Sequence, residues 1–188
     1  MPPSMLLRRM IGEIAHRGPD ATGHWPPLGD RSPAWLGHLR LSIVDLAAGG
    51  QPMSNEDGSV QVVYNGEIYN FPALRKRLEG AGHQFRTHSD TETIVHLYED
   101  EGVECFGHLN GMFAIAVWDR SERALILARD RVGEKPLYYG IQGGRTLLFG
   151  SELKALYAHP AFAGTINRDA LALYLRHNYI PVPHSIWE

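Results

Sequence analysis

The chain has 188 residues, of which 44% are hydrophobic and 21% are charged, and its formal net charge is −3. That length suffices for one well-buried domain, or for one domain and the start of another. Scattered Lys and Arg residues in a weakly acidic chain argue against nucleic acid as a partner. The longest apolar run, residues 112–118, is too short to cross a membrane, and the single cysteine, Cys105, excludes an internal disulfide. We therefore expect a cytoplasmic protein that binds neither nucleic acid nor membrane.

The first third of the chain is predicted to contain one helix and three strands. Apolar residues recur at helical spacing between residues 7 and 14, and the Gly-Pro pair that follows ends this helix. Apolar stretches between residues 35 and 45 predict two short strands. A third strand at residues 60–64 is predicted to break at Asn65 and Gly66, because an Asn-Gly pair suits a turn with positive φ.

Two capped helices are predicted next. Asn70 can cap a helix over residues 71–81, since a proline sits at its first turn and a glycine follows its end. Ser89 and Glu92 have the spacing of a capping box, which predicts a further helix that runs to about residue 102.

The second half of the chain is predicted to be rich in antiparallel strands. Residues 112–118 are apolar at every position, which indicates a strand buried on both faces. Further elements are predicted at residues 124–128, 137–141 and 146–149 (strands) and at residues 152–157 and 169–177 (helices, the last capped by Asn167). Periodicity therefore predicts an α+β fold in which stacked antiparallel sheets lie between helical layers.

A few polar residues have side chains suited to holding an amino acid. Arg40 lies among apolar residues, where a guanidinium can bind a carboxylate through two parallel hydrogen bonds, although pairing with a surface acid is the simpler alternative. Asn65 and Gly66 place a side-chain amide beside a backbone N–H, a pair that can stabilise an oxyanion, although Asn-Gly alone is usually a turn. Asp90 opens a helix, where capping is the simplest role unless a cation needs the carboxylate.

The ten histidines invite a metal hypothesis. His83 and His88 flank a predicted strand, but no His or carboxylate pair has a convincing ligand spacing with a third partner. We therefore expect no metal site.

Eight short motifs together carry a family resemblance. They are HRGPD (16–20), RLSIVD (40–45), QP (51–52), YNGEIYN (64–70), SDTE (89–92), LNGMFA (109–114), RD (129–130) and KPLYY (135–139). In this order they resemble the class II glutamine amidotransferase domain of asparagine synthetases, from about residue 6 to the end of the chain. The resemblance implies the N-terminal-nucleophile hydrolase fold, a four-layer sandwich of two antiparallel sheets between helical layers, and it implies a mainly structural role for residues 129–139.

The resemblance also implies a glutamine site. Arg40 would hold the α-carboxylate of glutamine, Asp90 would hold the α-ammonium with help from Glu67, and Asn65 with Gly66 would form the oxyanion hole. The implied glutamine-binding residues are Arg40, Leu41, Ser42, Ile43, Val44, Asn65, Gly66, Glu67 and Asp90.

The nucleophile is where the chain departs from the family. Members use an amino-terminal cysteine whose thiolate attacks the glutamine amide, with its own α-amino group as the base. Here the chain begins Met1-Pro2, almost at the first helix, so the first strand and its cysteine are expected to be missing, by truncation more than by evolved loss. Cys105 is no substitute, because it follows a helix where a partly buried small hydrophobe is expected.

The resemblance further implies a bifunctional protein. Residues 1–163 would be an amidotransferase domain that is incomplete at its amino end and needs no cofactor. Residues 164–188 would be a linker and the start of an ATP-binding synthetase domain that is otherwise absent, and that domain would use ATP and Mg²⁺ to amidate a carboxylate, aspartate by default. The expected partners are L-glutamine and the synthetase domain, and a homodimer is left open.

Two alternatives remain at this point. The domain could be a non-catalytic scaffold of a β-lactam-synthetase-like protein, but a scaffold has no reason to keep a whole glutamine pocket. It could also belong to another class II amidotransferase, such as the sugar-aminating or purine-pathway enzymes. Residues 40–45 and 65–69 resemble the asparagine synthetase branch better.

Overall fold

The structure is a computed structural model that describes residues 2–27, 32–41 and 49–188. Its helices are α1 (Pro3–Glu13), α2 (Phe71–Ala81), α3 (Asp90–Glu101), α4 (Leu153–Tyr157) and α5 (Arg168–His177), with 3₁₀ segments η1 (Ala15–Arg17) and η2 (Gly102–His108). Its strands are β1 (Ala21–Trp25), β2 (Leu36–Arg40), β3 (Met53–Ser54), β4 (Val60–Ile68), β5 (Gly111–Asp119), β6 (Ala124–Arg129), β7 (Tyr138–Gln142) and β8 (Thr146–Gly150).

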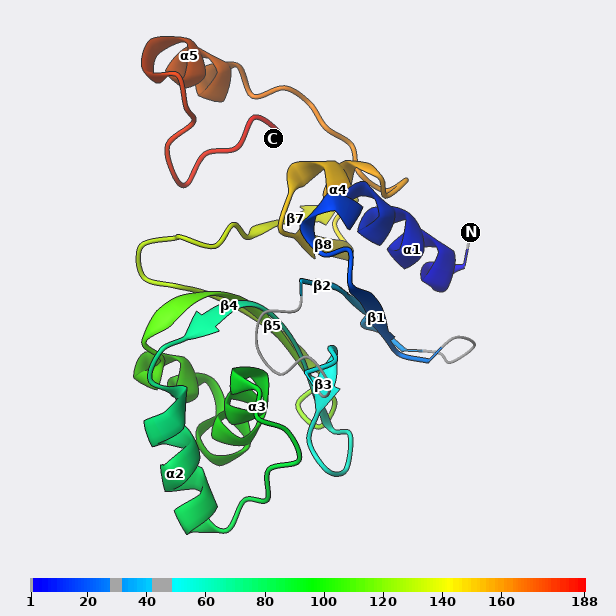
Figure 1. Ribbon diagram of the computed structural model, residues 1–188. Helices are drawn as coiled ribbons and strands as arrows, with labels where there is room; N and C mark the ends of the chain where they lie inside the picture. The colour runs from blue at the N-terminus through cyan, green and yellow to red at the C-terminus, as the bar shows by residue number, and fades with distance from the viewer. Residues whose placement is uncertain (1, 28–31, 42–48) are drawn as a thin grey trace.

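These elements form four layers (Figure 1). The antiparallel sheet β3-β4-β5-β6 is covered on one face by α2 and α3. On its other side lie the antiparallel pairs β1-β2 and β7-β8, and beyond them α1 and α4 contact each other, β2 and β8. The predicted α+β architecture with antiparallel strands is therefore confirmed.

The core divides between the two faces of the central sheet. Because side chains alternate along a strand, β5 sends Ile115 and Val117 to one face and Ala116 and Trp118 to the other. The first pair packs with α2 and α3 in the main cluster, whereas the second packs with Leu36 of β2. The prediction of a strand buried on both faces is confirmed, and β5 thereby holds the two halves of the sandwich together.

The predicted break in β4 is wrong. The strand continues through Asn65 and Gly66 to Ile68, with Gly66 directly opposite Phe113 of β5. A Cβ atom on Gly66 would lie 2.0 Å from the backbone oxygen of Met112. The glycine therefore serves the close approach of two strands and not a turn.

The start of α3 is only partly as predicted. Ser89 caps the helix, since its Oγ accepts from the Thr91 N–H at 3.2 Å. Glu92 does not complete the capping box, because its carboxylate accepts from the backbone N–H groups of Arg86 and Thr87, both at 2.7 Å. Glu92 thus fastens the preceding loop onto the helix. At α5 the predicted cap is confirmed, with Asn167 Oδ1 accepting from Ala170 N–H at 2.9 Å.

The segment after β6 is organised around Asp130, as a structural role requires. Its carboxylate accepts from the backbone N–H groups of Phe113, Glu134 and Lys135. Burial acts to raise the pKa of Asp130, but these hydrogen bonds outweigh it and hold the pKa below its ordinary value. Among the helices of residues 2–27, 32–41 and 49–188, none is long and apolar enough to span a membrane.

Candidate functional site

Polar groups gather along one edge of β4, between Tyr64 and Ile68. In an antiparallel pair the N–H groups of a strand point alternately to the partner strand and to the opposite edge. The N–H of Tyr64 donates to Gln51 Oε1 at 2.6 Å, and the N–H of Ile68 donates to Asp90 Oδ2 at 3.1 Å, so both lie on the edge away from β5. The Gly66 N–H, midway between them, therefore points to the same edge.

Asp90 holds a carboxylate at this edge. Its Oδ2 accepts from the Tyr64 hydroxyl at 2.8 Å as well as from the Ile68 N–H. Burial and the charge of Asp90 raise the pKa of Tyr64 far above its ordinary value, so the phenol remains a donor. The simpler alternative for Asp90, capping of the helix, is not what the structure shows, because Ser89 is the cap and the Asp90 carboxylate faces β4. Among the described residues Oδ1 has no hydrogen-bond partner, which leaves it able to accept from a ligand cation.

The side-chain amide of Asn65 lies on the face of β4 opposite to the Tyr64 side chain. It lines a cavity of about 720 Å³ whose walls come mainly from α1, β2, β5 and β8. Its Nδ2 atom is buried and has no hydrogen-bond partner within the part of the chain that the structure describes. Leaving a buried donor unpaired costs about 1–3 kcal/mol, which a ligand oxygen at this position would recover.

Arg40 is the last residue of β2, and the backbone around residue 18 packs directly against it. A Cβ atom on Gly18 would lie 2.7 Å from the backbone nitrogen of Arg40. The glycine of the motif at residues 16–20 thus allows the chain to pass close to the end of β2. Leu41 is 56% exposed. The remaining implied glutamine-binding residues, Ser42, Ile43 and Val44, lie outside the described residues.

Glu67 lies next to this edge and adds negative charge. Its side chain is exposed, and its backbone is paired with Met112 of β5. The charge of Glu67 is among the smaller causes that raise the pKa of Tyr64, so Glu67 lies within electrostatic range of the Tyr64 hydroxyl that donates to Asp90. Its predicted helping role toward a ligand ammonium stays a prediction.

His38 was not selected from the sequence, although the structure places it beside the predicted residues. It lies two residues before Arg40 on β2, and its Nε2 donates to the Tyr64 carbonyl oxygen at 3.1 Å. Burial lowers the pKa of His38 to about 4, with a smaller contribution from Arg40, against the opposing hydrogen bond to Tyr64. The ring is therefore neutral near pH 7. The sequence could have indicated His38, because residues 38 and 40 share one face of a strand and Arg40 was already a candidate.

His38 should make stability fall with acidification. The unfolded histidine binds a proton below its ordinary pKa of 6.5, whereas the folded one does so only near 4, so stability is lost from pH 6.5 down to 4. Between pH 7 and pH 5 this amounts to about 2 kcal/mol of unfolding free energy. His38→Gln, whose amide can still donate to Tyr64, should remove that part of the slope in denaturant titrations. His108→Gln, at an exposed ring, is the control, and an unchanged slope in His38→Gln would exclude this origin.

The whole chain, residues 1–188, matches the family model described as a glutamine amidotransferase domain. The chain belongs to the glutamine amidotransferase domain family. An asparagine synthetase (glutamine-hydrolysing) of Bacillus subtilis is 43% identical over 168 residues, which cover 88% of this chain and 26% of that protein. A synthetase of the same name from Arabidopsis thaliana is 47% identical over 143 residues, which cover 76% of this chain and 24% of that protein.

The solved structures agree with the fold of this glutamine amidotransferase domain. The glutamine phosphoribosylpyrophosphate amidotransferase of B. subtilis, solved with ADP and GMP, superposes with a TM-score of 0.65 at 23% identity and covers 82% of this chain and 40% of that one. The predicted sandwich fold is confirmed by this likeness, and the resemblance to asparagine synthetases is confirmed by the two synthetase relatives. The chain spans about a quarter of the length of the curated relatives it matches.

Proposed function

We propose that this amidotransferase domain binds L-glutamine and supplies its amide nitrogen as ammonia to a synthetase domain, which amidates a carboxylate, aspartate by default. The observation that carries the proposal is the buried, unpartnered Nδ2 of Asn65 beside the Gly66 N–H. A side-chain amide and a neighbouring backbone N–H suit the oxygen of a glutamine side-chain amide as it becomes an oxyanion. ATP and Mg²⁺ serve the synthetase domain in this proposal, and no residue of the described chain is assigned to them.

Two charged residues next to β4 match the charges of a free amino acid. Asp90 receives the α-ammonium on Oδ1, since Oδ2 is occupied by Tyr64 and Ile68. Arg40, at the end of β2, receives the α-carboxylate, and the hydrogen bond from His38 to the Tyr64 carbonyl oxygen joins β2 to β4 near these residues. One cation and one anion at a fixed separation select an α-amino acid over an amine or a simple acid.

The nucleophile in this proposal comes from a strand upstream of α1, with a cysteine as its first residue. The cavity of about 720 Å³ supports this assignment, because it lies between β2, β5 and β8 and has Asn65 in its wall. Its lining is mostly apolar and includes Leu7 and Ile11 of α1, which suits the buried face of a strand. A cysteine at the tip of such a strand would meet the amide held by Asn65.

Calorimetric titration with L-glutamine, L-glutamate and D-glutamine tests the proposal. L-glutamine should bind best, and Arg40→Lys should weaken its binding about 10- to 100-fold, because a point-charge ammonium cannot reproduce a two-pronged carboxylate contact. Arg77→Lys is the matched control, since Arg77 pairs with Glu101 on the far side of the sheet.

Two outcomes would count against the proposal. Equal affinities of wild type and Arg40→Lys would remove Arg40 from the site. Failure of L-glutamine to bind, both to this chain and to a form extended by a Cys→Ala strand, would favour the scaffold alternative instead.

A further inference from the structure

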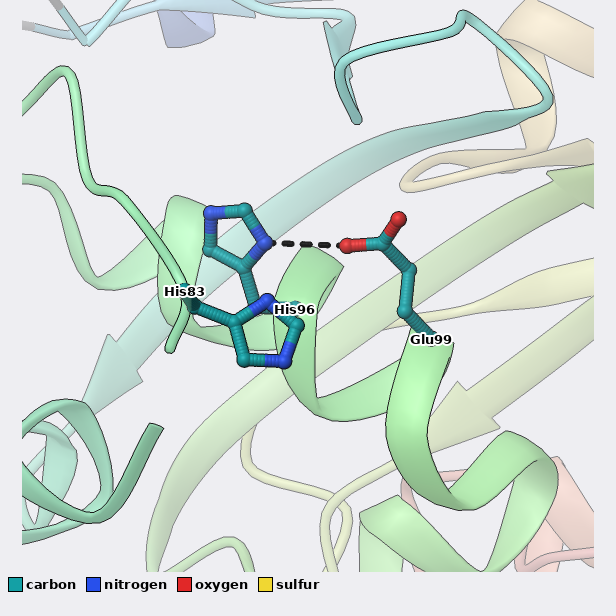
Figure 2. Close-up of side chains that lie close together, drawn as sticks. All are labelled: His83, His96 and Glu99. Atoms are coloured by element: carbon teal, nitrogen blue, oxygen red, sulfur yellow. Dashed lines mark hydrogen bonds and ion pairs between the residues drawn. The ribbon is translucent and has the colours of Figure 1, made fainter. Parts of the chain in front are cut away.

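We propose that His83, His96 and Glu99 form a binding site for a divalent transition-metal ion of the zinc class. His96 and Glu99 lie three residues apart on one face of α3, and His83 comes from the segment between α2 and α3. One ligand atom of each residue lies within 4.8 Å of the others. Figure 2 shows the His83 ring beside the His96 ring, with the Glu99 carboxylate facing His96.

His96 is the residue whose hydrogen bonding calls for an ion. Its side chain is 3% exposed, and its Nδ1 lies 2.9 Å from Glu99 Oε2. Its Nε2 is buried without a hydrogen-bond partner among the described residues, and a carboxylate oxygen of Glu92 lies 3.8 Å from it. If Nδ1 carried the proton of a neutral ring, the Nε2 lone pair would face that carboxylate. A metal on Nδ1 places the proton on Nε2 instead, where it can point to Glu92.

His83 has the matching arrangement. Its Nε2 lies 3.0 Å from Asp100 Oδ1, and a carboxylate can only accept, so Nε2 carries the proton. The Nδ1 atom is then the nitrogen left for a metal. A carboxylate behind each ligating imidazole is the usual way in which proteins fix the ring tautomer at metal sites.

A hydrogen bond from Asn55 fixes the position of the Glu99 carboxylate. Its Oε1 accepts from Asn55 Nδ2 at 2.9 Å, so Oε2 is the oxygen directed at His96. The charge around the cluster favours a cation, since Glu92 and Asp100 stand behind the two rings, while Arg86 on the wall of the neighbouring cavity opposes them.

The donor set selects the class of ion. Two imidazole nitrogens and one carboxylate oxygen suit Zn²⁺, whereas Ca²⁺ and Mg²⁺ prefer oxygen alone. Tetrahedral zinc ligands at about 2.1 Å from the ion are roughly 3.4 Å apart. On binding, the wider separations of up to 4.8 Å must therefore shorten, and the 2.9 Å between His96 Nδ1 and Glu99 Oε2 must lengthen slightly. His83 can supply this movement, because its side chain is 18% exposed and lies outside the helices. A fourth position can face the adjoining cavity of about 540 Å³, which His83 and Glu99 line.

The site is separate from the β4 edge and departs from the expectation that the chain has no metal ligands. His83 and His96 are too far apart in sequence for a local pattern to group them, and the fold of α2 against α3 brings them together. An ion here would fasten the α2–α3 segment to α3, the helix whose first residue is Asp90.

Zinc titration of untagged, chelator-treated protein tests the proposal. Competition against a chromophoric chelator should show one ion bound per chain, and the thermal midpoint should rise with Zn²⁺. His83→Ala should abolish stoichiometric binding, and Asp100→Asn should weaken it about 10- to 100-fold. His108→Ala is the matched control, because His108 also pairs with a carboxylate, Glu101 at 2.9 Å, outside the cluster. Visible absorption of the Co²⁺-loaded protein, altered only in the cluster variants, reports the ligands directly.

Either of two results would overturn the proposal. One is the absence of stoichiometric zinc binding by folded wild-type protein at micromolar zinc, which would leave His96 with only its contacts to Glu99 and Glu92. The other is equal zinc affinity of wild type and His83→Ala, which would place any bound ion elsewhere. Both readouts are independent of glutamine, so they stand whatever the fate of the proposed amidotransferase function.

Discussion

A polypeptide of these 188 residues should not hydrolyse L-glutamine at an enzymatic rate, whereas the same chain extended upstream by a Cys-first strand should do so. On the proposed mechanism, the oxyanion donors and charged groups contribute only residual catalysis when no nucleophile is present. In enzymes that work by covalent catalysis, loss of the nucleophile costs roughly 10⁶-fold in kcat, so the two forms should differ by at least about 10⁴-fold.

Cys105 cannot fill the role. Its side chain is fully buried in the main core cluster, beneath the face of β4 that Asn65 does not occupy. Burial, with a smaller effect of the Glu101 charge, raises the pKa of Cys105 to about 12. Only about one thiol in 10⁵ would then be ionised at pH 7, and no glutamine could reach it.

Glutamate release, followed by a coupled assay, is the measurement. The extended form with Cys105→Ala should keep its activity, and the extended form with its first cysteine changed to alanine should lose it. Turnover near one per second by the unextended chain would contradict the prediction. Thermal melts of the two forms give a second readout, since a strand in the cavity between β2, β5 and β8 should stabilise the extended form.

Gly66→Ala should destabilise the domain by about 3 kcal/mol or more. The added Cβ would lie 2.0 Å from the Met112 backbone oxygen and 2.8 Å from the Phe113 Cα atom. Neither backbone atom can move away without disturbing the pairing of β4 with β5, which carries the core on both sides. The free energy of unfolding, measured by denaturant titration, should therefore fall, and the thermal midpoint should fall with it.

Gly80→Ala is the matched control for this substitution. Gly80 lies inside α2, and no atom outside its own helical turn lies within 4 Å of the place that a Cβ would take, so alanine should stabilise the helix by about 0.5–1 kcal/mol. Equal stability of Gly66→Ala and wild type would show that β5 can give way at Met112, and it would remove the packing explanation for this glycine.

The sequence alone predicted those elements that depend on neighbouring residues in the chain. The all-apolar run at residues 112–118 predicted β5, since burial on both faces leaves no polar position in a strand. Asn167 predicted the start of α5, because its side chain caps the helix from a neighbouring position. The ordered motifs went further and predicted the family and fold, and they singled out Gly66, Asp90 and Asn65, which the structure places on β4 or against its edge.

Tertiary structure alone decided the features that depend on residues far apart in the chain. β1 has no apolar alternation and becomes a strand because β2 offers its backbone partners. The Asn65-Gly66 pair locally favours a turn, yet pairing with β5 places Gly66 within a strand. The position of Asp90 at the start of a helix favours capping, yet its carboxylate accepts hydrogen bonds from the Tyr64 hydroxyl and the Ile68 N–H. In each case hydrogen bonds and packing from a distant segment outweighed the local conformational propensity. That propensity is small, and a local stretch of sequence shows it without showing the distant segment that will override it.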